Sequence, residues 1–299
     1  MFRMRNLALL LRARQVPFVL LINDHPPALE LLRRDGLTFE VVDLTRIEHW
    51  APDTIRRHRV QVWVNDRLDT DLSQARTISE AGIPLVTFDD RGTGAQLADL
   101  HIAALALDPG ERLEGNRVLH GLDYLILNPE IARWRRQRTE LRSAMITLGG
   151  SDTYGVTVRA VALLRKQIRN ATVIIGPGFQ HRTALDAELP EDFDLKIGVP
   201  SLIEEMNRHD LSITGGGITA FEAAASGLPV IAIANEWFEV PPARHLAKLG
   251  AARYAGHHSN LDESALAIPR DVTAMSSAGL ARIPLHGAER VCQLLLELA

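Results

Sequence analysis

The chain has 299 residues, with 33 Lys and Arg against 37 Asp and Glu, and its net charge of −4 gives no electrostatic reason to expect a nucleic-acid partner. The single cysteine, Cys292, excludes a disulfide framework and a cysteine-based metal site. An apolar fraction of 46% is typical of a globular chain, no apolar run approaches the roughly 20 residues of a membrane span, and the length predicts two domains of about 150 residues each.

The N-terminal segment 1–15 combines recurrent arginines with one short apolar run, Leu7 to Leu11. No small-residue cleavage site follows this run, as it would in a signal peptide. We therefore expect an amphipathic helix here and a cytoplasmic location for the protein.

Strands and helices alternate in the first part of the chain. Near-continuous apolar runs predict parallel strands buried on both faces, and segments that end in glycine predict helices. The predicted strands are 16–24, 38–43, 60–66 and 84–90, followed by the apolar segment 100–107, and the predicted helices are 26–36 and 72–82.

A second alternating series begins at residue 143. Its predicted strands are 143–150, 171–178, 194–198, 211–213 and 229–233, and its predicted helices are 156–168, 201–209, 220–225, 241–249 and 262–267. Between the two series, residues 126–142 combine Pro129 with five arginines and no strand pattern, as a linker or a surface helix would.

This alternation implies parallel sheets with helices on both faces. We expect an α/β protein with two doubly wound Rossmann-like domains that face a cleft. The predicted parts are an amino-terminal domain 1–125, a linker 126–142, a second domain 143–285, and a terminal helix 286–299 that packs back onto the first domain.

The segment from Thr214 to Glu236 carries the clearest functional signal. A short apolar strand enters three glycines, 215–217, and a helix follows at once. Glycines let the backbone approach a ligand, and a helix N-terminus offers N–H groups and a positive dipole end to an anion. The pattern predicts a phosphate site, with Glu222 one turn into the helix and placed to bind ribose hydroxyls. A tight turn built only for packing is the alternative, but the turn ends a strand of a βαβ unit, which favours binding.

This strand–glycine–helix segment resembles the donor-nucleotide site of GT-B glycosyltransferases. The nearer resemblance is to the UDP-sugar hydrolases of pseudaminic acid biosynthesis and their spore-coat polysaccharide relatives (PseG/SpsG-like), and the more distant one is to the MurG-type N-acetylglucosaminyltransferases. Further segments are similar in the same order: VTFDDRG (86–92), LHGLDYLILNPEI (119–131), ITLGGSD (146–152), VPSLIEEMNRHDLSITGGG (199–217) and GAERV (287–291).

The resemblance implies which residues hold a UDP-sugar. The implied nucleotide-binding residues are Gly149, Gly150, Ser151, Val199, Gly215, Gly216, Gly217, Ile218, Thr219 and Glu222. The glycine turn and the two residues after it would hold the diphosphate, Glu222 the ribose, and the backbone near Val199 the uracil. In the facing loop, Ser151 or Asp152 would also cap the next helix. Asn235 would contact the sugar, and neither a cofactor nor a metal is expected.

Three departures from the family concern its first strand and the sugar. The family begins with a strand and a loop ending in Gly-His, whose histidine is the expected activator of water. Met1 and Phe2 stand at that position here, so we expect either further residues upstream or a rearranged domain that lacks its first strand. Glu236 replaces a glutamine of the family, so that either the sugar or acceptor differs or Glu236 turns away. Asp-Pro-Gly (108–110) replaces Asp-Gln-Asn.

Weaker candidates remain outside the glycine turn. Asp89 and Asp90 end a predicted strand, where paired carboxylates could perform acid–base catalysis, bind a metal or cap the following turn. His257 and His258 lack further ligands at metal spacing and are interpreted as loop residues.

Two classes of function stay open. The first is an enzyme that acts on a UDP-linked sugar, by hydrolysis or by transfer, in surface-polysaccharide or nonulosonic-acid biosynthesis. The second is a non-catalytic nucleotide-sugar-binding subunit or an inactive truncated homologue. The sequence leaves the sugar, the acceptor and the oligomeric state open.

Overall fold

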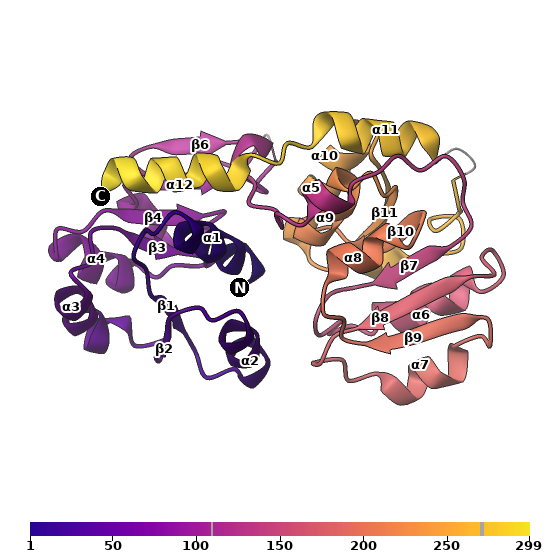
Figure 1. The fold of residues 1–299 in the computed structure, drawn as a ribbon, viewed down its shortest axis with the longest axis horizontal. Coiled ribbons are helices and arrows are strands. Elements are labelled where there is room, and N and C mark those ends of the chain that lie inside the picture. Colours follow the sequence, from indigo (N-terminus) through magenta and orange to yellow (C-terminus); the bar gives the residue numbers. More distant parts are fainter. Residues whose placement is uncertain (109, 270–271) are drawn as a thin grey trace. The chain divides into compact units, whose positions relative to one another are not determined.

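The computed structural model describes residues 1–108, 110–269 and 272–299. The chain divides into two compact units, of which unit 1 comprises residues 1–127 and 285–299 and unit 2 comprises residues 128–284. Both units are built from parallel strands that alternate with helices (Figure 1), so the predicted α/β class with two sheet domains is confirmed. In the described part of the chain, no helix combines the length and apolarity that crossing a membrane requires.

Unit 1 contains two separate parallel sheets. β1 (Leu20–Ile22) pairs with β2 (Phe39–Val41), and the other sheet has the strand order β3-β4-β5-β6. The bounds of these four strands are Trp63–Asn65, Leu85–Phe88, Leu100–Ala103 and Val118–His120. The helices of unit 1 are α1 (Phe2–Ala13), α2 (Pro26–Arg34), α3 (Ile47–His58), α4 (Leu72–Glu80) and α12 (Gly287–Leu298).

The two sheets of unit 1 leave an interruption between β1 and β3. In a doubly wound sheet the first strand lies between the second and the fourth. β2 and β1 lie side by side as the third and second strands of such a sheet would, and β3 begins the other part. Among the described residues, no strand pairs with β1 or β3 on the edges that flank this interruption.

Arg3 fastens the amino-terminal helix α1 to strand ends of unit 1. Its buried guanidinium donates hydrogen bonds to Asp66 and Asp89 and lies 4.8 Å from the ring centroid of Phe88. Desolvation alone would lower the pKa of Arg3, but attraction to the two carboxylates outweighs it and raises the pKa. The terminal helix α12 packs against α1 within the same unit.

Unit 2 contains one six-stranded parallel sheet of order β12-β11-β10-β7-β8-β9. Its strands in chain order, β7 to β12, are Ala144–Thr147, Ala171–Ile175, Phe193–Ile197, Leu211–Gly215, Val230–Ala234 and Ala252–His257. Its helices, α5 to α11, are Ile131–Trp134, Val156–Leu164, Arg182–Glu188, Leu202–Asn207, Ile218–Ala225, Val240–Lys248 and Thr273–Arg282. The strands β7, β8 and β11 are buried along their whole length, as expected for parallel strands covered on both faces.

The pattern of apolar residues missed several elements and predicted one wrongly. The missed elements are α3, α7, α11, β6 and β12. The predicted helix 262–267 is a turn. The Asp262 carboxylate accepts hydrogen bonds from Ser264 Oγ at 2.7 Å and from Ala265 N at 2.8 Å, as an N-cap aspartate does at the start of a helix, but the chain does not continue as a helix beyond this turn.

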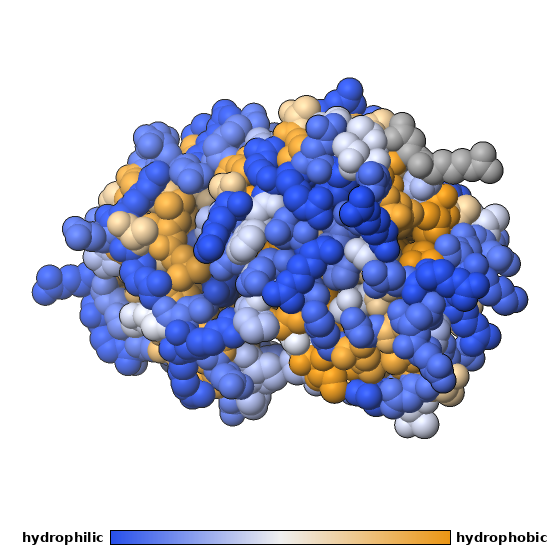
Figure 2. All heavy atoms as spheres, turned by 45° about the vertical axis from the view of Figure 1, so that its right-hand side comes forward, coloured by the Kyte–Doolittle hydropathy of each residue, from blue (hydrophilic) through white to orange (hydrophobic). Residues whose placement is uncertain are grey.

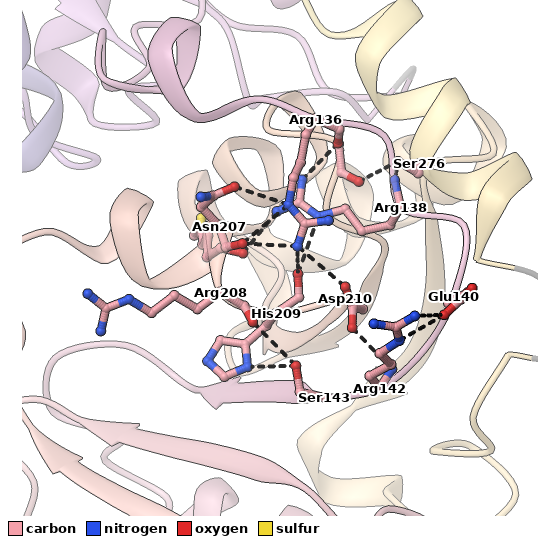
Figure 3. A network of polar contacts seen from close by, with 12 residues as sticks. Arg136, Arg138, Glu140, Arg142, Ser143, Asn207, Arg208, His209, Asp210 and Ser276 are labelled. Carbon is pink, nitrogen blue, oxygen red and sulfur yellow. Dashed lines mark hydrogen bonds and ion pairs between the residues drawn. The ribbon is translucent and has the colours of Figure 1, made fainter.

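Residues 128–142 belong to unit 2, although the sequence pattern suggests a linker at 126–142. The segment is held by Arg138, whose side chain is 1% exposed and donates hydrogen bonds to backbone oxygens (Figure 3). Those oxygens belong to Arg136, Met206, His209 and Ser226. The backbone N–H of Arg138 also donates to Ser276 Oγ at 2.8 Å. This side chain therefore joins the segment to the C-terminal ends of α8 and α9.

Burial lowers the pKa of Arg138 to about 9, and the charge of Arg136 acts in the same direction. The guanidinium thus stays protonated at neutral pH. A cation at this place complements the negative dipole ends of two helices.

We expect Arg138→Met to lower the free energy of unfolding of unit 2 by about 3 kcal/mol or more, because buried carbonyl groups that lose their partners cost about 1–3 kcal/mol each. Arg142→Met is the matched control, since the Arg142 side chain is 78% exposed and pairs with Glu140, and a change of at most about 0.5 kcal/mol is expected. Chemical denaturation with hydrogen exchange of β10 and α9 measures both variants. Equal losses in the two would contradict the assigned role of Arg138.

Candidate functional site

The carboxyl edge of the sheet in unit 2 gathers the predicted site loops. Parallel strands end together at one edge, where open α/β sheets bind ligands. β12, β11, β10 and β7 are successive neighbours. The residues paired at this edge are Thr214 with Thr147, Gly215 with Ile233, and Ala234 with His257. The loops that follow these strands therefore leave the sheet side by side.

The glycine turn joins β10 to α9 without a side-chain cap. α9 begins at Ile218, two residues earlier than predicted, and Gly217 at the N-cap position has no side chain to bond the first N–H groups. A methyl group on Gly216 would lie 2.7 Å from the backbone oxygen of Glu239, so only glycine fits there. Packing thus requires Gly216, while the N-terminus of α9 offers N–H groups and a positive dipole end to an anion.

Glu239 binds this turn from the neighbouring loop, and sequence reasoning missed it. Its Oε2 accepts hydrogen bonds from the backbone N–H of Gly216 at 3.3 Å and of Asn235 at 2.8 Å. Desolvation raises the pKa of Glu239, the charge of Glu236 adds to the rise, and the backbone hydrogen bonds offset part of it. The spacing of one helical turn between Asn235 and Glu239 is the signal that the sequence offered. Glu239 places a carboxyl group beside the predicted diphosphate site.

Asn235 and Glu236 follow β11, and their side chains have different surroundings. Asn235 Oδ1 and Thr214 Oγ1 are buried and have no hydrogen-bond partner among the described residues. An unpaired buried acceptor costs about 1–3 kcal/mol, so a hydroxyl donated by a ligand would stabilise this arrangement. Glu236 turns toward Tyr154, whose hydroxyl donates to Glu236 Oε1 at 3.0 Å.

The loop after β7 brings Gly149, Gly150 and Ser151 to the same edge. Gly149 has φ +94°, a region that favours glycine. Asp152 caps α6, as expected of either Ser151 or Asp152. Its carboxylate accepts hydrogen bonds from the N–H groups of Val156 at 2.8 Å and Thr157 at 2.7 Å.

Glu222 and Val199 are the predicted contacts of the ribose and the base. Glu222 lies in α9, and its Oε1 accepts the backbone N–H of Asn128 at 3.2 Å. Val199 follows β9, which β7 and β8 separate from β10 in the sheet. However, α8 begins shortly after Val199 and packs against α9. The chain after β9 therefore returns toward the helix that carries Glu222.

Asp89 and Asp90 lie in unit 1 after β4 and are only 3% and 1% exposed. Asp89 accepts hydrogen bonds from Arg3, from Leu105 N at 2.7 Å and from Ala106 N at 2.9 Å. Asp90 accepts them from Thr70 Oγ1, from Thr70 N at 3.0 Å and from Gly92 N at 2.9 Å. These contacts favour the interpretation that both carboxylates hold the turn after the strand, rather than perform catalysis. The Asp-Pro-Gly departure includes residue 109, which lies outside the described residues.

No family model matches the chain. In sequence, it is 26% identical over 225 residues to the spore coat polysaccharide biosynthesis protein SpsG of Bacillus subtilis, which covers 71% of this chain and 66% of SpsG. It is also 28% identical over 202 residues to an uncharacterized protein of Methanocaldococcus jannaschii, which covers 60% of this chain and 41% of that protein. The chain therefore matches about two thirds of one relative and less than half of the other.

Solved structures show the fold. MurG of Acinetobacter baumannii is similar with a TM-score of 0.70 at 15% identity, over 99% of this chain and 95% of MurG. The spinosyn rhamnosyltransferase SpnG, in complex with thymidine diphosphate, is similar with a TM-score of 0.57 at 17% identity, over 93% of this chain and all of that chain. The resemblance expected from the sequence is thus confirmed, and the chain is a GT-B-fold protein similar to SpsG that shares its fold with MurG.

Proposed function

We propose that unit 2 binds a UDP-linked sugar and that the protein acts on it in the biosynthesis of a surface polysaccharide or a nonulosonic acid. The observation that carries this proposal is the N-terminus of α9, which has no side-chain cap and lies behind Gly215–Gly217 at the carboxyl edge of a parallel sheet. Such a terminus binds phosphate through backbone N–H groups and the helix dipole. The name of SpsG assigns that relative to polysaccharide biosynthesis, and SpnG is a glycosyltransferase solved with a nucleoside diphosphate.

Each part of the ligand has a matching group. The diphosphate meets the glycine turn and the first N–H groups of α9, with the loop 149–151 beside it. The ribose hydroxyls donate to Glu222, the uracil lies near Val199, and a sugar hydroxyl donates to the unpartnered Asn235 Oδ1. Charge-assisted hydrogen bonds to a carboxylate are stronger than neutral ones, which suits Glu222 to this role.

The same site fits hydrolysis and transfer, because both reactions start from one nucleotide-sugar and need an activated oxygen nucleophile. A non-catalytic nucleotide-sugar-binding subunit is the second candidate. The observation that favours it is the engagement of Asp89 and Asp90 with the backbone of unit 1. Release of UDP from a UDP-sugar, assayed with and without an added acceptor, separates the three possibilities.

We expect UDP to bind without a divalent metal, because backbone N–H groups and a helix N-terminus neutralise much of the diphosphate charge. Isothermal calorimetry with UDP, repeated in EDTA, should give the same dissociation constant. Absence of binding up to millimolar UDP would remove the proposed function, and binding that EDTA abolishes would remove its metal-free part.

Glu222→Ala should weaken UDP binding by at least about tenfold, since each charge-assisted hydrogen bond contributes about 1.5–3 kcal/mol. Glu222→Gln is the matched control, because its amide oxygen can still accept the N–H of Asn128. We expect the Glu222→Gln variant to bind UDP better than the Glu222→Ala variant does, and to have the same unfolding midpoint as the wild-type protein. Calorimetry and thermal denaturation of both variants provide the measurement. If the alanine variant bound UDP as tightly as the wild-type protein does, the proposed contact between Glu222 and the ribose would be refuted.

Glu239→Gln should strengthen UDP binding several-fold at pH 8, because two like charges about 4 Å apart repel by about 1 kcal/mol even in water. Gln can keep both backbone hydrogen bonds through one oxygen, since Oε2 alone accepts them now. The pKa of Glu239 is raised, and the wild-type carboxyl becomes neutral as the pH falls through this raised pKa. Below it, the variant and the wild-type protein should therefore bind UDP equally well.

The same titration affects stability with a known sign. A carboxyl whose pKa is raised on folding stabilises the folded state at low pH and loses that contribution as the pH rises. Glu239→Gln should therefore raise the free energy of unfolding at pH 8 but not below the ordinary pKa of glutamate.

For the binding experiment, weaker UDP binding by the Glu239→Gln variant at pH 8 would contradict the expected repulsion. It would show instead that the charge of Glu239 supports the glycine turn.

A further inference from the structure

Four aromatic side chains form two stacked pairs, joined by a tilted contact, at the sheet edge that carries the glycine turn. Trp237 and His257 lie face to face, with ring centroids 4.1 Å apart and planes within 4°. His257 contacts His258 at 4.4 Å, and His258 stacks on Tyr154 at 4.2 Å. Sequence reasoning placed both histidines in a loop, but His257 is the last residue of β12. We call these four residues the aromatic stack.

The aromatic stack belongs to the same sheet edge as the predicted nucleotide site. Its members follow or end β11, β12 and β7, of which β11 and β12 are neighbours, while β10 lies between β11 and β7. Glu236, which precedes Trp237 in the chain, accepts the hydrogen bond of the Tyr154 hydroxyl. This bond holds Tyr154 at one end of the stack, and the Nδ1 contact of His257 with Ser259 Oγ at 2.9 Å holds the ring on which Trp237 lies.

Trp237 is 70% exposed even though one face of its indole lies on His257. Its other face is therefore open to solvent. Apolar residues appear between hydrophilic ones on the surface shown in Figure 2, so the exposure of an apolar side chain does not by itself indicate a binding site. Trp237 differs because stacking holds its ring in place, and a ring that is already ordered loses little entropy when a ligand covers it.

The groups around Trp237 select the ligand. The indole face is electron-rich, so it attracts the positive edges of C–H bonds or a cation. Glu236 beside it repels phosphate and other anions but accepts hydrogen bonds from hydroxyls. Asn235 Oδ1 on the preceding residue is a buried acceptor with no partner in the described part of the chain. A neutral pyranose, with C–H groups on its face and hydroxyls at its rim, satisfies all three.

We propose that the open face of Trp237 is a stacking platform for the sugar ring of the nucleotide-sugar, with Asn235 and Glu236 accepting its hydroxyls. This proposal rests on the proposed function of the nucleotide site. It assigns Trp237 the discrimination between a nucleoside diphosphate and its glycosylated form. The uracil and the diphosphate bind elsewhere, on the glycine-turn side of Asn235.

The test compares UDP with UDP-N-acetylglucosamine and UDP-glucose by calorimetry. The variants are Trp237→Ala, Trp237→Phe and, as matched control, Phe238→Ala. Phe238 is the next residue and is 44% exposed, but it makes no ring contact within the described residues. We expect Trp237→Ala to weaken binding of at least one UDP-sugar by about 2- to 10-fold and to leave UDP binding unchanged. Trp237→Phe should restore most of the loss, and Phe238→Ala should cause none.

Other outcomes separate the two proposals. If the wild-type protein binds neither UDP nor a UDP-sugar, the nucleotide site itself is refuted. If UDP binds but Trp237→Ala weakens UDP and UDP-sugars in parallel, Trp237 contacts the nucleotide and the sugar platform is refuted. The platform is also refuted if Trp237→Ala changes nothing, or if Phe238→Ala has the same effect.

Discussion

The hydrogen bonds from the buried guanidinium of Arg138 to backbone oxygens are the interaction on which unit 2 depends. One of these oxygens belongs to Ser226, the C-cap of α9, and another to Met206 in α8. A protein cation thus satisfies the negative end of α9, while its positive end lies at the glycine turn. The helix is therefore anchored at the end that binds no ligand, and its dipole points at the candidate anion site.

The turns at the sheet edge are coupled to one another through polar side chains. Glu239 bonds the backbone of both Gly216 and Asn235, so the loops after β10 and β11 hold a common geometry. Asp152 fixes the loop after β7 in the same manner by capping α6. Loops that are ordered before a ligand arrives reduce the entropic cost of binding. The negative charge of Glu239 acts against this gain in affinity, because it repels a bound diphosphate.

Local sequence patterns predicted what depends on local chemistry. The glycine turn and the Asp152 cap were predictable because strand, glycines and helix follow one another directly in the chain. Arg138 was not, because an arginine-rich segment without apolar spacing gives no sign that one guanidinium is buried by carbonyls distant in sequence. Likewise, the sequence around Asp89 and Asp90 is the same whether their carboxylates bind a substrate or accept hydrogen bonds from the backbone, so it could not predict which of the two occurs. The strand β12 was missed because ARYAGH contains no apolar run.

The interruption in the sheet of unit 1 has a consequence for how the protein behaves in concentrated solution. β1 and β3 each present backbone N–H and C=O groups that no other strand of the described chain pairs. Unpaired edges are templates for β-addition between molecules, and native proteins limit them by keeping edge strands short. Both strands are only three residues long, which restricts the contact that a foreign strand can make. The shortness of the strands that flank the interruption thus limits the contact through which two molecules could associate at these edges.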